Sequence, residues 1–308
     1  MTDSSPGPSK LKATIAFLAV YIIWGSTYLA IRIAIESMPP FLMAAARHGI
    51  SGAILLAFAL GRRRARATLP QLRDATIVGL LLLLGGNGGV SWAQQWVPSG
   101  LTALLVASVP LWMGVFAVLF HRSRRPRARG IAGIAIGFVG VGILVRPGGE
   151  IAGDAQMLGG AIGVLLAALC WAAGSLYASR SNLPADPIFS TGFEMVAGAA
   201  GLIVAGSATG EWARVDLSAV TARSALAWVY LALFGSIVAF SAYVWLLKHV
   251  SPAKVATYAY VNPAVAVALG ATIGKEPIGP RTLVATAIII GAVVMITSER
   301  ASRPEGEG

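Results

Sequence analysis

The chain has 308 residues, of which 56% are hydrophobic and only 12% are charged. A soluble globular domain carries about 25% charged residues, so this composition excludes an ordinary soluble fold. The net charge of +11 would suit a nucleic-acid-binding protein, but the basic residues lie in short loops between apolar runs. In such loops they are typical of topology signals and of contacts with anionic lipid headgroups. We therefore expect a lipid bilayer as partner and no nucleic acid.

Ten apolar runs fill the chain, and each is long enough to cross a bilayer. About 20 apolar residues form a helix about 30 Å long, which matches the hydrocarbon thickness. The first run lacks a small-residue cleavage site, so we interpret it as a span and not as a cleaved signal peptide. The predicted spans are 13–35, 40–60, 75–94, 99–119, 130–145, 157–178, 188–206, 224–247, 253–273 and 281–298.

Lysine and arginine are distributed unevenly over the two sides of the predicted membrane. With the N-terminus in the cytoplasm, 17 of them lie on the inner side and 5 on the outer side. Positive residues favour the cytoplasmic side in short loops. The sequence therefore predicts a multi-pass protein with both termini in the cytoplasm.

The two halves of the chain resemble each other at an offset near 150 residues. The matches are Trp24 with Trp171, Tyr28 with Tyr177, and 97–110 with 250–263. Each half, 13–145 and 157–298, then holds five spans, and an odd number inverts the second copy relative to the first. Inverted repeats are typical of transporters with a pocket at the repeat interface. We predict an all-α polytopic membrane protein with ten transmembrane helices in two inverted five-helix repeats.

Two charged residues lie inside predicted spans, where a central charge costs about 2.5–3.5 kcal/mol. Arg47 lies in the second span and Glu194 in the seventh. In a functional interpretation, Arg47 contacts a substrate carboxylate, and Glu194 is a proton-sensitive group or contacts a substrate ammonium. The alternative is that carbonyls, water or another side chain neutralise each of them. His48 follows Arg47 but faces another way, and we expect it to have a structural role.

Aromatic residues deep in the spans are candidates for substrate contact. They are Trp24, Tyr28, Trp171 and Tyr258, together with Tyr177. Trp24 and Tyr28 are four residues apart and therefore share a helix face. An indole and a phenol on one face suit an amphipathic ligand, whereas packing against neighbouring helices is the alternative.

Two amides and two prolines lie near the middle of predicted spans. Asn87 and Asn262 are predicted to line a cavity, and interhelical hydrogen bonding, worth about 0.6–2 kcal/mol, is the alternative. Pro110 and Pro263 occupy equivalent positions in the repeats. Proline removes one helical hydrogen bond, so we expect a kink and a hinge at each.

Chemical motifs of other protein classes are missing from the sequence. There is no Walker A motif, no cluster of His, Cys and Asp for a metal, and no nucleophile at a recognisable distance from a base. We expect no enzymatic activity, no cofactor and no metal site. The single cysteine, Cys170, allows no intramolecular disulfide.

Four motifs carry a family resemblance. They are Tyr-Ile-Ile-Trp-Gly-Ser-Thr-Tyr at 21–28, Pro-Pro at 39–40 before Ala-Ala-Arg at 45–47, Val-Pro-Ser-Gly at 97–100 before Val-Pro at 109–110, and Ser-Pro at 251–252 before Tyr-Ala-Tyr-Val-Asn-Pro at 258–263. They resemble the EamA-type branch of the drug/metabolite transporter superfamily over nearly the whole chain. The resemblance implies ten helices in two inverted repeats, cytoplasmic termini, and export of small metabolites, often amino acids or their derivatives.

We therefore expect a secondary transporter or facilitator that exports small metabolites, amino acids first, across the bacterial inner membrane by alternating access. Export of other solutes, such as cationic drugs or sugar derivatives, is the first alternative. A membrane enzyme or sensor is the second, but it needs a catalytic cluster or a soluble output domain. The sequence leaves the coupling ion, the direction of flux and the oligomeric state open.

Overall fold

A computed structural model describes residues 10–62, 67–120, 128–145, 154–250, 252–255 and 257–301. All regular elements in these ranges are helical. The α-helices are α1 (Lys10–Leu18), α2 (Gly25–Ala34), α3 (Pro40–Gly61), α4 (Leu69–Gly79), α5 (Gly89–Ala93), α6 (Ser99–Val106), α7 (Val109–Phe120), α8 (Ala128–Val145), α9 (Ala155–Ala178), α10 (Pro187–Ala208), α11 (Ala222–Tyr230), α12 (Ala239–His249), α13 (Pro252–Val255), α14 (Tyr258–Thr272) and α15 (Pro280–Ala301).

Three π-helical segments continue α-helices without a break. They are η1 (Ala19–Trp24) between α1 and α2, η2 (Leu80–Gly88) between α4 and α5, and η6 (Leu231–Val238) between α11 and α12. Two short 3₁₀ turns, η4 (Glu211–Arg214) and η5 (Leu217–Ala219), follow α10. Near their middle, the first, third and eighth spans therefore change from α-helical to π-helical hydrogen bonding while the helix continues.

Nine helical stretches of the described residues are long and apolar enough to cross a membrane. The predicted span at 253–273 is instead divided into α13 and α14. Helix α14 has 15 residues and is about 22 Å long, so it does not cross the hydrocarbon core alone. The predicted span at 99–119 is also interrupted, because Ala107 and Ser108 form a turn between α6 and α7.

Local capping residues set where several helices begin. Helix α4 begins six residues earlier than the predicted span at 75–94, because Thr68 and Gln71 form a capping box before it. Asp186 accepts hydrogen bonds from the amides of Ile188 and Phe189 at 2.9 and 3.1 Å and so starts α10. The capping residues explain why helix ends differ from the hydropathy boundaries.

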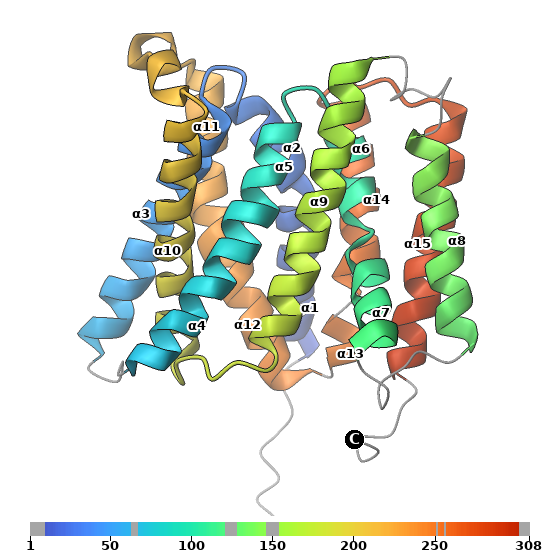
Figure 1. Cartoon of the computed structure of the whole chain (residues 1–308), viewed down its shortest axis with the longest axis horizontal. Coiled ribbons are helices and arrows are strands. Elements are labelled where there is room, and N and C mark those ends of the chain that lie inside the picture. The colour runs from blue at the N-terminus through green and yellow to red at the C-terminus, as the bar shows by residue number, and fades with distance from the viewer. Residues whose placement is uncertain are drawn as a thin grey trace, which may run out of the picture.

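Successive spans alternate in direction across the bundle (Figure 1). We call the face where α1 begins and α15 ends the lower face, and the opposite face the upper face. The first span runs upwards, whereas the sixth, α9, runs downwards. The second set of five spans is therefore inverted relative to the first, and the described ends of the chain, Lys10 and Ala301, lie on the same face.

The exterior of the bundle is apolar. Large aliphatic side chains are exposed on outward helix faces, among them Leu11, Ile54, Leu166 and Val204. Lipid tails are as apolar as leucine, so these faces suit a hydrocarbon environment. Several polar residues of the spans are directed inwards, and Arg47, His48, Ser51 and Asn262 are all buried. The protein is thus an all-α polytopic membrane protein.

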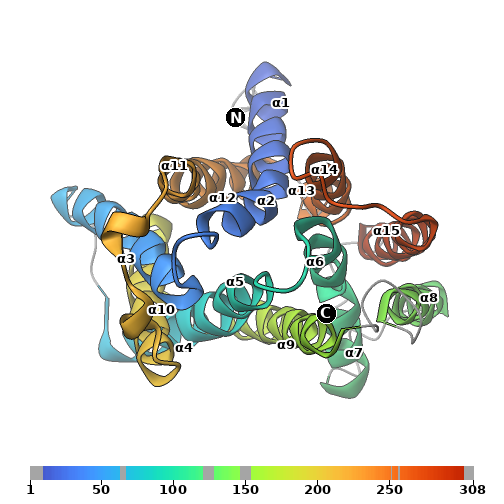
Figure 2. The same ribbon diagram turned by 90° about the horizontal axis from the view of Figure 1, so that it is seen from above.

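Glycine permits close packing of α8 against α15 at the edge of the bundle seen in Figure 2. A Cβ atom at Gly140 would lie 2.8 Å from Ile289 Cγ1 and 3.0 Å from Ile288 Cγ2. A Cβ atom at Gly142, on the same helix, would meet no atom within 4 Å. The close packing of α8 against α15 therefore requires a glycine at position 140 but not at position 142.

We predict that Gly140→Leu lowers the melting temperature of the detergent-solubilised protein by several degrees. Forcing a side chain into a packed interface costs about 1–3 kcal/mol. The matched variant Gly142→Leu, which faces open space, should melt like the parent protein. Equal melting temperatures for the two variants would contradict this packing.

Candidate functional site

Arg47 lies inside the membrane at the contact between the two repeats. Arg47 is only 4% exposed, and its Nε donates a 2.9 Å hydrogen bond to Ser236 Oγ of η6. Its Nη1 is buried and finds no hydrogen-bond acceptor among the described residues. The ion pairs of the described part of the chain do not include Arg47 either. A buried cation therefore presents one free donor group.

A network of hydrogen bonds holds the surroundings of Arg47 in place. His48 Nε2 lies 3.1 Å from Asn87 Oδ1 of η2. Ser51 Oγ donates to the Ala232 carbonyl at 2.9 Å, and Ser236 Oγ donates to the Leu231 carbonyl at 3.1 Å. Asn87 thus makes an interhelical contact through its side-chain amide oxygen, which was the alternative to lining a cavity. The network joins the second, third and eighth spans.

Trp24 contacts the same part of η6. Its Nε1 donates a 3.1 Å hydrogen bond to the Gly235 carbonyl. A Cβ atom at Gly235 would lie 3.2 Å from Arg47 Nη2 and 3.1 Å from Thr27 Cγ2. Gly235 therefore binds the indole through its carbonyl, while its missing side chain leaves room for the Arg47 guanidinium and for Thr27.

Aromatic rings extend the site below Trp24. The Trp24 ring centroid lies 5.2 Å from that of Tyr243 and 5.4 Å from that of Tyr258. Tyr243 and Tyr258 meet edge to face at 5.8 Å. Edge-to-face arrangements are favourable for aromatic pairs. The result is an aromatic cluster, defined as Trp24, Tyr243 and Tyr258, that joins the first, eighth and ninth spans.

The π-helices carry several of these residues. Trp24 ends η1, Asn87 lies in η2, and Gly235 and Ser236 lie in η6. Well under 1% of residues in proteins are π-helical, and such segments are frequent at functional sites. Backbone carbonyls of η6 accept hydrogen bonds from Trp24, Ser51 and Ser236. The wide helix therefore offers backbone acceptors at mid-membrane depth.

Asn262 and Tyr28 lie on neighbouring helices next to these groups. Asn262 is buried, and its Oδ1 accepts no hydrogen bond from the described residues. A Cβ atom at Gly25 would lie 3.2 Å from the backbone carbonyl oxygen of Asn262, so α2 and α14 approach closely there. The Tyr28 carbonyl accepts a 3.0 Å hydrogen bond from Gln94 Nε2. Asn262 therefore offers a free amide oxygen.

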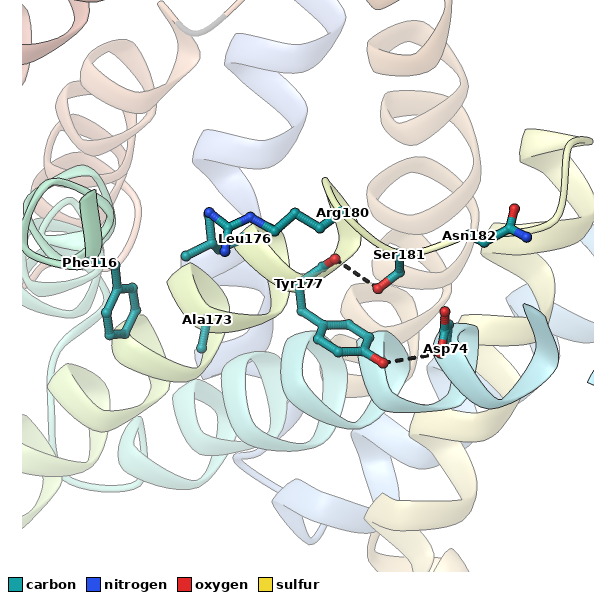
Figure 3. Close-up of a pocket in the computed structure, with 8 residues that line it drawn as sticks. All are labelled: Asp74, Phe116, Ala173, Leu176, Tyr177, Arg180, Ser181 and Asn182. Carbon is teal, nitrogen blue, oxygen red and sulfur yellow. Dashed lines mark hydrogen bonds between the residues drawn. The ribbon is translucent and has the colours of Figure 1, made fainter. Parts of the chain in front are cut away.

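Other predicted residues lie apart from the Arg47 network. Tyr177 OH donates to Asp74 Oδ1 at 3.1 Å and lines a cavity of about 520 Å³ at the lower face. Figure 3 shows Tyr177 directed towards Asp74 in that cavity. Glu194 accepts a 2.8 Å hydrogen bond from Ser190 Oγ on its own helix. Trp171 packs on η2, where a Cβ atom at Gly86 would lie 2.8 Å from its ring.

The two prolines occupy different structural positions despite their equivalent places in the repeats. The sequence predicts a kink at Pro110 in the middle of a span, but Pro110 does not lie in the middle of a helix. It is the second residue of α7, after the turn at Ala107 and Ser108, where its missing N–H costs no helical hydrogen bond. Pro263 lies inside α14, as expected. The interruption replaces the predicted kink in the first repeat.

Sequence reasoning missed Ser236, Gly235 and Gln94. Serine and glycine are common in membrane helices, so neither residue stands out in the sequence. Gln94 lies at the predicted end of a span, where polar residues are ordinary. Within the described residues, no three His, Cys, Asp or Glu side chains gather to hold a metal ion.

The sequence profile of the EamA-like transporter family matches residues 11–146 and 158–298. The chain belongs to the EamA-like transporter family. It is 44% identical over 284 residues to the "Uncharacterized inner membrane transporter YedA" of Escherichia coli K12, covering 92% of this chain and 89% of the relative. This family membership makes the chain a membrane transporter.

Two further proteins are similar along their length. The "Probable amino-acid metabolite efflux pump" of Escherichia coli K12 is 28% identical over 297 residues, covering 91% of this chain and 93% of the relative. A solved crystal structure covers 96% of this chain and 100% of its own, with a TM-score of 0.62 and 21% identity. That structure supports the fold of this EamA-like transporter.

Proposed function

We propose that this chain is a secondary transporter or facilitator that exports small zwitterionic metabolites, amino acids first, across the bacterial inner membrane. The observation that carries the proposal is the buried Arg47 guanidinium with its free Nη1 at the repeat interface, next to Gly235, whose carbonyl binds Trp24. A desolvated cation of this kind favours a carboxylate, and the planar guanidinium matches carboxylate geometry.

The remaining groups suit the other parts of an amino acid. The aromatic cluster offers apolar surface for a side chain. The free Oδ1 of Asn262 is a neutral acceptor for an ammonium group. The similar amino-acid metabolite efflux pump and the inner membrane transporter support the substrate class and the location.

The proposed transport cycle is alternating access between the two inverted repeats. The excess of lysine and arginine on the predicted inner side supports cytoplasmic termini. The described ends of the chain lie on the lower face, which makes the lower face the cytoplasmic one. The turn at Ala107 and Ser108 and the helix interior at Pro263 interrupt regular hydrogen bonding. We propose these two places, in equivalent spans of the repeats, as pivots.

Export of cationic solutes is the competing function. A cation site would need a carboxylate, and Glu194 is the candidate. Its hydrogen bond to Ser190 is made within its own helix, and no ion pair of the described residues joins it to Arg47. The positive centre at Arg47 therefore favours substrates with a carboxylate over cations.

Purified protein in liposomes tests the proposal. We expect counterflow of labelled amino acids above the level of empty vesicles. The matched competitors are the amide and the decarboxylated amine of the amino acid that is transported fastest. Because they lack the carboxylate, about 10-fold higher concentrations of them should be needed to inhibit transport by half. Preference for the amine would favour the cationic alternative, and no counterflow of any amino acid would overturn the proposed substrate class.

A further inference from the structure

Gln94 connects the first and third spans at the upper end of the site. It follows α5, is fully buried, and donates from Nε2 to the Tyr28 carbonyl of α2 at 3.0 Å. Arg32, one turn above Tyr28 on α2, donates from Nη1 to the Gln94 carbonyl. The bridge formed by Gln94 and Arg32 therefore lies directly above Tyr28.

The chemistry of this bridge allows it to break and reform. Both contacts join a side chain to a backbone carbonyl, so neither depends on interlocked apolar surfaces. The Gln94 carbonyl lies at the end of a helix, where carbonyls lack an intrahelical partner and attract cations. Gln94 Oε1 is buried without a hydrogen bond from the described residues, and water would satisfy it once the bridge opens.

The repeat counterpart of this place borders a cavity. Tyr177 and Ser181 match Tyr28 and Arg32 at an offset of 149 residues. Both line the cavity of about 520 Å³ at the lower face, and Figure 3 shows them together with Arg180 and Asp74. Equivalent positions thus carry the Gln94 and Arg32 bridge at the upper face and border a cavity at the lower face, where Tyr177 donates to Asp74 of α4.

We propose that Gln94 and Arg32 form the upper gate of the substrate path. They are positioning residues: they hold the first and third spans together above the site while the lower face is open, and they separate when the upper face opens. The inference rests on the proposed alternating access, but it does not depend on which metabolite is carried.

Cysteine accessibility in oriented membrane vesicles tests the gate. In a Cys170→Ala background, Val90→Cys reports access below the bridge, because Val90 is buried one turn before Gln94. We expect Gln94→Ala to raise the rate at which a membrane-impermeant maleimide labels this cysteine from the upper face about 10-fold. Arg32→Ala should raise it in the same direction, and Gln94→Asn should raise it less.

The matched control is Gln95→Ala, because Gln95 Nε2 donates to the Trp92 carbonyl within its own segment. This variant should label at the parent rate. Ser181→Cys, labelled from the lower face in parallel, separates gating from loosening of the fold. Alternating access predicts slower labelling at Ser181 when the bridge is removed.

Faster labelling at Val90 with slower labelling at Ser181 supports both the gate and alternating access. Faster labelling at Val90 with an unchanged rate at Ser181 supports the gate but contradicts the proposed coupling of the two faces. An unchanged rate at Val90, or faster labelling at both positions, overturns the gate.

Discussion

Replacing Arg47 by alanine should reduce amino-acid transport roughly 100-fold. The variant removes the buried cation and its free Nη1, and a lost charged hydrogen bond in a desolvated site costs about 3 kcal/mol, which corresponds to roughly 100-fold. Arg47→Lys keeps the charge but loses the planar donor pair, so it should restore part of the activity. Initial rates in proteoliposomes measure both effects.

The control for Arg47 is Arg223→Ala, since the Arg223 side chain is 60% exposed and pairs with Glu36 at 3.5 Å. Exposed ion pairs contribute about 0–1 kcal/mol, so this variant should transport at the parent rate. Size-exclusion profiles and melting temperatures show whether each variant is folded. Unchanged transport in folded Arg47→Ala would leave Arg47 with a structural role only.

Replacing Trp24 by alanine should raise the KM for transport roughly 10-fold. The variant loses the hydrogen bond to the Gly235 carbonyl and two ring contacts. A hydrogen bond contributes about 0.5–1.5 kcal/mol and an aromatic pair about the same. Trp24→Phe keeps a ring but loses the hydrogen bond, so its KM should lie between those of the parent and Trp24→Ala.

Trp212→Ala is the matched tryptophan control. Trp212 is 57% exposed at the upper face and donates to Ser207 Oγ at 2.8 Å. Its removal should leave the KM unchanged. If Trp24→Ala changed only the melting temperature and not the KM, the aromatic cluster would be a packing feature and not a part of the binding site.

The residues of the candidate site illustrate why sequence reasoning found only part of it. Arg47 was predictable because a charge in an apolar run is costly wherever the helix faces. Trp24 and Tyr258 were predictable as deep aromatic residues, but their contact was not. Their approach depends on how η1 and α14 rotate about their axes, and helices that are apolar all round carry no polar stripe that reveals this rotation.

The same reason explains the separation of Tyr177 and Glu194 from Arg47. Glu194 and Arg47 occupy equivalent spans in the sequence, but their hydrogen-bond partners differ. Glu194 binds Ser190 on its own helix, whereas Arg47 binds Ser236 on η6. The π-helices were not predictable, because a shift in hydrogen-bond register leaves no signature in composition. Gln94 was missed because its role depends on the contact with α2.

The sequence by itself determined the lipid environment, the number of spans and the two-repeat organisation, because hydropathy, length and charge bias can be read locally along the chain. Only the tertiary structure decided which polar groups meet at Gly235, where the spans are interrupted, and that one face is bridged while the other opens to a cavity. Those features depend on close packing between distant helices, where a single glycine or amide sets the geometry.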